Sequence, residues 1–78
     1  MYGHVRYVKL RKYIGQVVRL RYQTLDTFNQ TVLVLDVTKS GTLYYRDSYL
    51  ERFIETNKIL RITTLSELDQ VMWKLENT

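Results

Sequence analysis

The sequence predicts one domain that is mainly β with some α-helix: a small five-stranded barrel with a short N-terminal helix and a C-terminal helix. After Gly15 the apolar residues recur with a period of two, which is typical of strands buried on one face. From residue 64 onwards they recur at intervals of three and four, which is typical of a helix. We therefore expect residues 1–14 to be an N-terminal helix or arm, 15–63 the barrel and 64–76 the C-terminal helix.

At the N-terminus, residues 5–14 place Tyr7, Leu10 and Ile14 on one helical face. Gly15 follows, where a left-handed cap would end a helix. A strand through part of this stretch is the alternative, because two valines lie off the stripe.

The barrel segment contains five short runs with strand character. In the first run the apolar residues alternate with Arg19 and Arg21, which gives one apolar and one basic face; Val17 is on the basic side.

Gly41 supplies the positive φ of a hairpin turn over residues 38–41, and Asp36 marks a bulge or protects an edge. Residues 24–29 read as a polar loop and 56–58 as a tight helical turn. Such short strands favour a curled sheet over a two-layer sandwich, and we expect them at residues 16–23, 30–37, 42–47, 49–55 and 59–64.

The C-terminal segment has a start signal and an apolar stripe. Thr64 and Glu67 match a capping box, in which each side chain accepts from a free backbone N–H group. Trp73 points away from the stripe, among polar neighbours. The stripe consists of Leu65, Leu68, Met72 and Leu75.

The amino-acid composition limits the classes of function that the chain can have. With 78 residues, 45% hydrophobic and 26% charged, the chain fits one globular domain. It has no cysteine, which excludes disulfides and thiolate metal sites and suits a reducing compartment, so we expect a cytoplasmic protein. No apolar run approaches the roughly 18 residues that cross a bilayer, so no membrane partner is expected.

Catalytic groups are sparse. The single histidine, His4, has no serine or carboxylate beside it in the sequence, and no glycine-rich phosphate loop is present. Asp26, Asp36 and Asp47 are too far apart to form a loop-type cation site. We therefore expect a non-enzymatic binding module without a cofactor or metal.

Positive charge is concentrated at one end of a chain whose net charge is +4. Six basic residues and no acid precede Asp26, whereas all eight acids and the other six basic residues come from there onwards. This asymmetry indicates a polyanion or an acidic protein as partner, although a basic edge can also serve solubility alone.

The first functional hypothesis is binding of single-stranded RNA or DNA, in which aromatic faces stack on bases and basic groups follow phosphates. Tyr44 and Tyr45 are adjacent on a strand, so one faces the core and the other faces outward. The outward tyrosine could equally cover a neighbouring strand or the terminal helix. The candidate residues are Lys9, Arg11, Lys12, Arg19, Arg21, Tyr44, Tyr45, Arg46 and Arg52, with Arg46 and Arg52 flanking the exposed ring.

The second hypothesis is a protein-interaction module or homo-oligomer that uses the C-terminal helix. Tryptophan is a frequent anchor at interfaces, so Trp73 is the central candidate, together with Leu68, Met72 and Leu75. The alternative is that Trp73 packs inside the domain with its indole N–H bonded to backbone.

The order of elements resembles a known family of small barrels. The helix, the segment "IGQVVRLR" and the hairpin across "TKSG" resemble the Sm-like fold, as does the spacing of Leu10, Gly15, Val18 and Leu20. The central part is similar to a WYL domain, with Leu43 to Tyr45 at its name-giving motif and Ile54 to Ile59 at a later one. SH3-type barrels would give nearly the same pattern. Over residues 15–65, the resemblance implies contact with a ligand or single-stranded nucleic acid and a ring-like assembly through strand edges.

Overall fold

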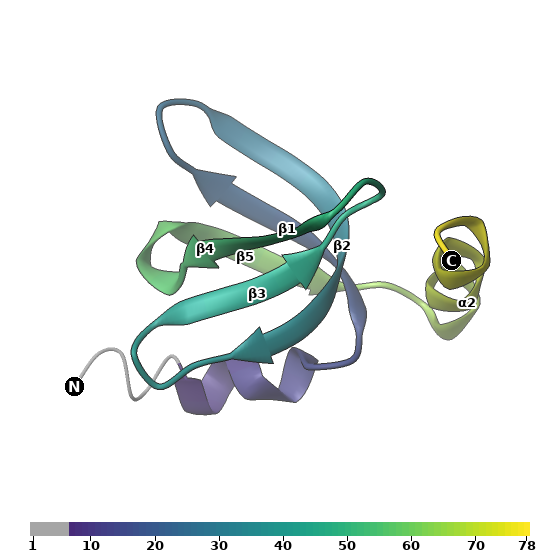
Figure 1. The fold of residues 1–78 in the computed structure, drawn as a ribbon, viewed down its shortest axis with the longest axis horizontal. Coiled ribbons are helices and arrows are strands. Elements are labelled where there is room, and N and C mark those ends of the chain that lie inside the picture. The colour runs from purple at the N-terminus through teal and green to yellow at the C-terminus, as the bar shows by residue number, and fades with distance from the viewer. Residues whose placement is uncertain (1–6) are drawn as a thin grey trace.

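The computed structural model describes residues 7–78 and shows one strongly curved antiparallel sheet with helical segments at both ends (Figure 1). Residues 7–10 are helical and run into the 3-10 turn η1 (Arg11–Tyr13). A second 3-10 turn, η2 (Thr56–Lys58), precedes the last strand, and α2 (Glu67–Glu76) ends the chain. The strands are β1 (Val17–Gln23), β2 (Thr27–Val37), β3 (Thr42–Arg46), β4 (Glu51–Glu55) and β5 (Ile59–Thr64). The predicted mainly β fold class is confirmed. The expected start of the first helix and His4 lie outside the described residues.

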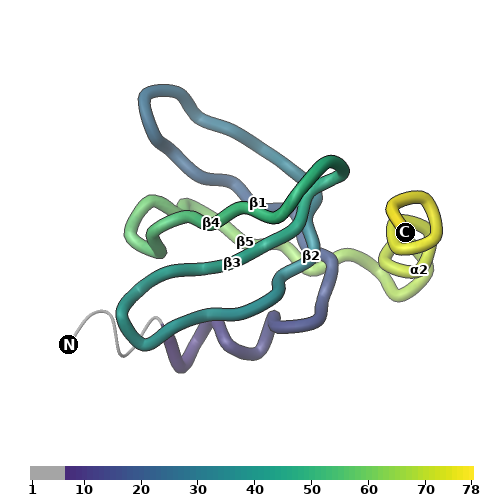
Figure 2. The backbone as a smooth tube through the Cα atoms, viewed as in Figure 1, coloured from purple at the N-terminus to yellow at the C-terminus, as the bar shows by residue number. Residues whose placement is uncertain are grey.

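The strand order is β4-β3-β2-β1-β5, and each neighbouring pair is antiparallel. The long strand β2 pairs with β1 over Thr27–Leu33 and with β3 over Leu33–Val37. The two hairpins therefore share β2 end to end and diverge from each other, as the tube in Figure 2 shows. No ladder within residues 7–78 joins β4 to β5, so these strands are the two edges of the sheet.

The concave face of the sheet holds the core. Residues 7–13 pack against it from below through Tyr7, Leu10 and Tyr13 (Figure 1). The predicted position of Ile14 on this stripe is wrong, because the chain tightens to 3-10 geometry and brings Tyr13 inward instead, leaving Ile14 exposed. The buried core consists of Val18, Leu20, Tyr22, Val32, Val34, Val37, Leu43, Tyr45, Ile54 and Ile59.

Glycines close two of the predicted turns. Gly15 has a φ of +86° and Gly41 a φ of +99°, which confirms left-handed conformations at both positions. The turn at Gly41 is closed by backbone bonds between Thr38 and Thr42 (2.9 Å) and from Gly41 to Thr38 (3.1 Å). The register shift between Val34 and Asp36 confirms a bulge near Asp36, which lies in a central strand rather than at an edge.

The predicted loop over residues 24–29 is too long, because only residues 24–26 lie outside the strands. Strand β2 already begins at Thr27, and the backbone N–H of Thr24 donates to Asp26 across a short turn (3.0 Å). This half of β2 is only partly buried, so several of its residues are polar. The apolar pattern that predicts a strand is therefore weak there.

Helix α2 is capped and packed differently from the prediction. Ser66, not Thr64, is the N-cap: its hydroxyl accepts from the backbone N–H of Asp69 (3.1 Å), while Thr64 belongs to β5. The helix docks through Trp73, which is only 9% exposed, and through Gln70, whose side chain accepts from the backbone N–H of Val17 (3.0 Å). This contact buries Val17 on the convex face of the sheet. Within residues 7–78 no helix is long and apolar enough to span a membrane.

Candidate nucleic-acid interface

Three exposed arginines lie side by side on the convex face of the sheet. Arg19 and Arg21 project from β1 on the side opposite Leu20 and Tyr22, as the alternation predicted. Arg61 of β5 is the direct cross-strand partner of Arg21. Like charges opposite each other on a sheet destabilise it. The fold therefore keeps an unfavourable charge pair in an exposed position, and we call Arg19, Arg21 and Arg61 the arginine face.

The neighbours of the arginine face are polar and uncharged. On β2, Thr31 pairs with Arg19 and Asn29 pairs with Arg21, while Thr63 of β5 pairs with Arg19 on the other side. The one salt bridge between described residues joins Arg52 to Asp47, so no member of the arginine face is ion-paired. Three cations without compensating carboxylates form a surface suited to a polyanion.

The two adjacent tyrosines of β3 face opposite sides, as predicted. Tyr45 is buried in the core, and this burial, followed by the neighbouring Tyr22, raises the pKa of its hydroxyl to about 12. Tyr45 is therefore not a surface residue on which a base could stack. Tyr44 is 42% exposed and lies against Phe53 with ring centroids 6.0 Å apart. Its cross-strand partner in β2 is Asp36, so this aromatic pair borders an acid rather than the arginine face.

Neither of the predicted flanking arginines places its guanidinium over the ring of Tyr44. The guanidinium of Arg46 stacks over the ring of Trp73 at 5.4 Å and donates to the backbone carbonyl of Asn77 (2.7 Å). Arg52 donates from Nε to the Oδ2 of Asp47 (2.7 Å). Arg46 thus fastens α2 to the sheet, and Arg52, a residue of β4, is bonded to the loop that follows β3.

Asp47 organises that loop. Its carboxylate accepts from the backbone N–H groups of Leu50 (2.9 Å) and Tyr49 (2.8 Å) as well as from Arg52. The hydrogen bond from Leu50 is the leading reason why the pKa of Asp47 lies below its usual value, and the bonds from Tyr49 and Arg52 act in the same direction. The carboxylate is therefore committed to holding the β3–β4 turn and orienting Arg52.

The N-terminal basic residues form a separate group. Arg11 lies over the ring of Tyr7 at 5.6 Å, and Lys12 lies over the ring of Tyr13 at 5.1 Å. With the exposed Lys9 they belong to the helical segment below the sheet, not to β1 and β5 (Figure 1). The structure thus does not gather the predicted nucleic-acid residues into one surface.

The predicted protein interface is only partly accessible. Trp73 is buried within the domain, so the prediction that it anchors a partner is wrong; one large ring covers the exposed end of the sheet better than the smaller leucines do. Leu68 and Leu75 are each 71% exposed, and Val71 and Met72 lie between them on the outer side of α2.

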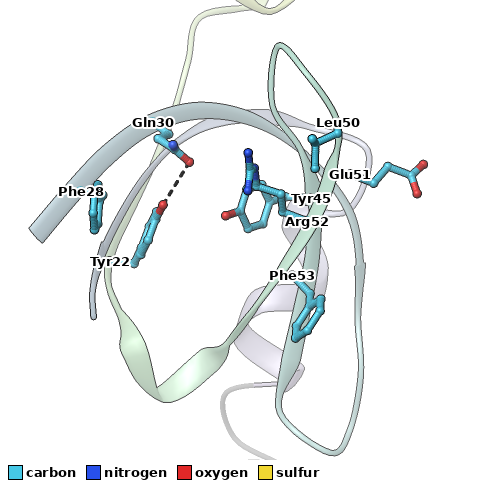
Figure 3. Close-up of a pocket in the computed structure, with 8 residues that line it drawn as sticks. All are labelled: Tyr22, Phe28, Gln30, Tyr45, Leu50, Glu51, Arg52 and Phe53. Atoms are coloured by element: carbon cyan, nitrogen blue, oxygen red, sulfur yellow. Dashed lines mark hydrogen bonds between the residues drawn. The ribbon is translucent and has the colours of Figure 1, made fainter. Parts of the chain in front are cut away.

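A groove opens where the two hairpins diverge. It has a volume of about 510 Å³, and Tyr22 and Tyr45 face each other across it from opposite strands (Figure 3). Among residues 7–78, no group of three or more His, Cys, Asp or Glu side chains could hold a metal ion. The groove is lined by Tyr22, Phe28, Gln30, Tyr45, Leu50, Glu51, Arg52 and Phe53.

The sequence interpretation missed Arg61, Phe28 and Gln30. Alternation in "ILRITT" already puts Arg61 on the outer side of its strand, but which strand lies beside it depends on the topology. Phe28 and Gln30 continue the alternation of β2 toward its N-terminus, and this signal was available in "TFNQTV".

No family model, no curated protein and no solved structure matches the chain.

Proposed function

We propose that this chain is a non-enzymatic module that binds single-stranded nucleic acid through the arginine face. The observation that carries the proposal is the direct pairing of Arg21 with Arg61, next to Arg19, on a surface without ion pairs among the described residues. A bound phosphate backbone would relieve the repulsion between these side chains and release its own counterions. The Sm-like resemblance of the sequence points in the same direction.

The test compares two variants that remove the same number of charges from different surfaces. One variant carries Arg19→Gln, Arg21→Gln and Arg61→Gln. The matched control replaces Lys9, Arg11 and Lys12 with glutamine. Binding of a fluorescent single-stranded oligonucleotide is measured by anisotropy over a range of salt concentrations, and circular dichroism checks that both variants fold.

We expect the affinity of the unaltered protein to fall steeply with salt. Each phosphate contact on a single strand contributes about 0.7 to the slope of log K against log salt concentration, so losing three contacts lowers the slope by about 2. The N-terminal variant should retain most of the slope. Equal losses in both variants would show that net charge alone attracts the oligonucleotide, and absence of salt-dependent binding would refute the proposal.

A second candidate function is association with a protein through the outer side of α2. The exposure of Leu68 and Leu75 supports it, because large apolar side chains grouped on one helix face are typical of interaction surfaces. Trp73 has no part in this version of the hypothesis.

A further inference from the structure

We propose that the exposed aromatic pair of Tyr44 and Phe53, with the carboxylates beside it, is a docking surface for an arginine-bearing segment of a partner protein. We call Asp36, Tyr44, Phe53 and Glu55 the acidic aromatic surface. It lies on strands β2, β3 and β4, whereas the arginine face lies on β1 and β5. Binding at this surface is a property beyond the proposed contact with nucleic acid and does not depend on it.

Strand pairing brings the four residues together. Tyr44 of β3 has Asp36 of β2 as its partner on one side and Phe53 of β4 on the other. Glu55 follows Phe53 by two residues on β4, so both project from the same side of that strand. Glu55 is opposite Thr42, which makes it a diagonal neighbour of Tyr44. The buried residues that alternate with them and face the core are Val37, Leu43, Tyr45 and Ile54.

The two rings are exposed, and no cation of the domain covers them. Phe53 is 68% exposed and Tyr44 is 42% exposed, although their ring centroids lie only 6.0 Å apart. By contrast, arginine or lysine side chains lie over Tyr7, Tyr13 and Trp73. None of the cation–π contacts between described residues involves Tyr44 or Phe53. The faces of this pair are therefore free to receive a guanidinium group, which ring faces attract within about 6 Å of the centroid.

The carboxylates favour a cationic partner and disfavour a polyanion. Asp36 and Glu55 are exposed, and no salt bridge joins either of them to another residue of the described part of the chain. Oδ1 of Asp36 accepts from the backbone N–H of Val37 (2.8 Å), which orients this carboxylate. Glu51 also lies two residues from Phe53, but its cross-strand partner is Arg46, a cation. In a chain of net charge +4, the acidic aromatic surface is thus a local reversal of sign that would repel phosphates.

Arginine suits this combination of groups better than lysine does. Its planar guanidinium stacks flat on an aromatic ring while its edge donates to a carboxylate, whereas the ammonium of lysine is a compact and strongly hydrated point charge. A second copy of the chain is a poorer occupant, although its arginine face carries the same group. Both surfaces lie on the convex side of the sheet, and two convex surfaces meet over a small area. A flexible segment of another protein has no such restriction.

The experiment uses the full chain and two synthetic peptides of equal length. One peptide alternates arginine with glycine, and the other has citrulline, which is a neutral isostere of arginine, at each arginine position. Binding is measured by titration of amide chemical shifts at one low salt concentration. The arginine peptide should shift the resonances of Asp36, Tyr44, Phe53 and Glu55, whereas the citrulline peptide should leave them in place.

A pair of charge variants tests the carboxylates. Asp36→Asn with Glu55→Gln should weaken binding of the arginine peptide about two- to thirtyfold, which is the range for the loss of two exposed ion pairs. The matched control is Glu67→Gln with Glu76→Gln, which removes the same charge from exposed positions on α2 and should keep the affinity within about twofold.

A pair of ring variants tests the aromatic side chains. Tyr44→Leu with Phe53→Leu keeps apolar cover but removes both flat rings, so it should weaken binding about two- to fivefold for each ring that the guanidinium contacts. Tyr49→Leu is the control, because Tyr49 is 89% exposed in the β3–β4 turn and is not part of the surface. Circular dichroism checks that each variant folds.

Three results would overturn the proposal. The first is equal binding of the arginine and citrulline peptides, a comparison that needs no variant. The second is chemical-shift changes that lie outside the acidic aromatic surface, or equal losses of affinity in the test and control variants. The third is self-association of the unaltered protein in sedimentation that disappears both in Asp36→Asn with Glu55→Gln and in the glutamine variant of the arginine face, because the occupant is then a second copy.

Discussion

Replacement of Trp73 with alanine tests whether the terminal helix is part of the domain. The side chain is 9% exposed, and aromatic side chains bury about 150–250 Å² each. At about 25 cal/mol per Å² this corresponds to about 4–6 kcal/mol, and measured tryptophan truncations in cores cost about 3–5 kcal/mol. A domain of 78 residues has a free energy of unfolding of about 4–12 kcal/mol, so the loss should be a large fraction of the total.

The expected mechanism is loss of helix docking. Helix α2 has 10 residues, which is too short to persist in water without tertiary contacts, and its contact with Arg46 disappears with the indole ring. The variant should therefore lose helical signal in circular dichroism under native conditions and unfold at lower urea concentration. Leu75→Ala is the control: its side chain is 71% exposed, so the change in free energy of unfolding should stay within about 0.5 kcal/mol. A loss below about 1 kcal/mol for Trp73→Ala, or equal losses for both variants, would refute the docking argument.

Two further predictions concern the β3–β4 turn and the outer side of α2. Because the pKa of Asp47 is lowered by its hydrogen bonds, chiefly the one from Leu50, its stabilisation is present above about pH 4 and is lost as the pH falls through the lowered value. Asp47→Asn should thus cost about 1–3 kcal/mol at pH 7 in urea unfolding, with a difference from the unaltered protein that shrinks toward pH 2; a difference independent of pH would contradict this. If α2 binds a second copy, sedimentation velocity should show a dimer that Leu68→Gln with Leu75→Gln converts to monomer, whereas an unaltered protein that sediments as a monomer at all concentrations would count against self-association.

Local pattern was sufficient to predict the mainly β fold and much of its detail. Period-two alternation and short apolar runs located five strands, except for the first residues of β2. The two glycines with positive φ marked the end of the first helical segment and the hairpin before β3. The same alternation assigned Arg19 and Arg21 to the outer side of β1 and assigned Tyr44 and Tyr45 to opposite sides of β3. These features depend on neighbours in the chain, so the sequence alone contains them.

Tertiary structure decided which outer surfaces remain free. Helix α2 turns Trp73 rather than the leucine stripe toward the sheet, because the helix contacts only the end where Val17 and Arg46 lie. Strand order placed Arg61 beside Arg21 and separated both from Tyr44, although no sequence spacing indicates which strands are neighbours. Hydrophobic periodicity specifies which residues of a segment lie on its apolar face and which lie on its polar face. Where those faces lie in the molecule depends on contacts between segments that are distant in the sequence.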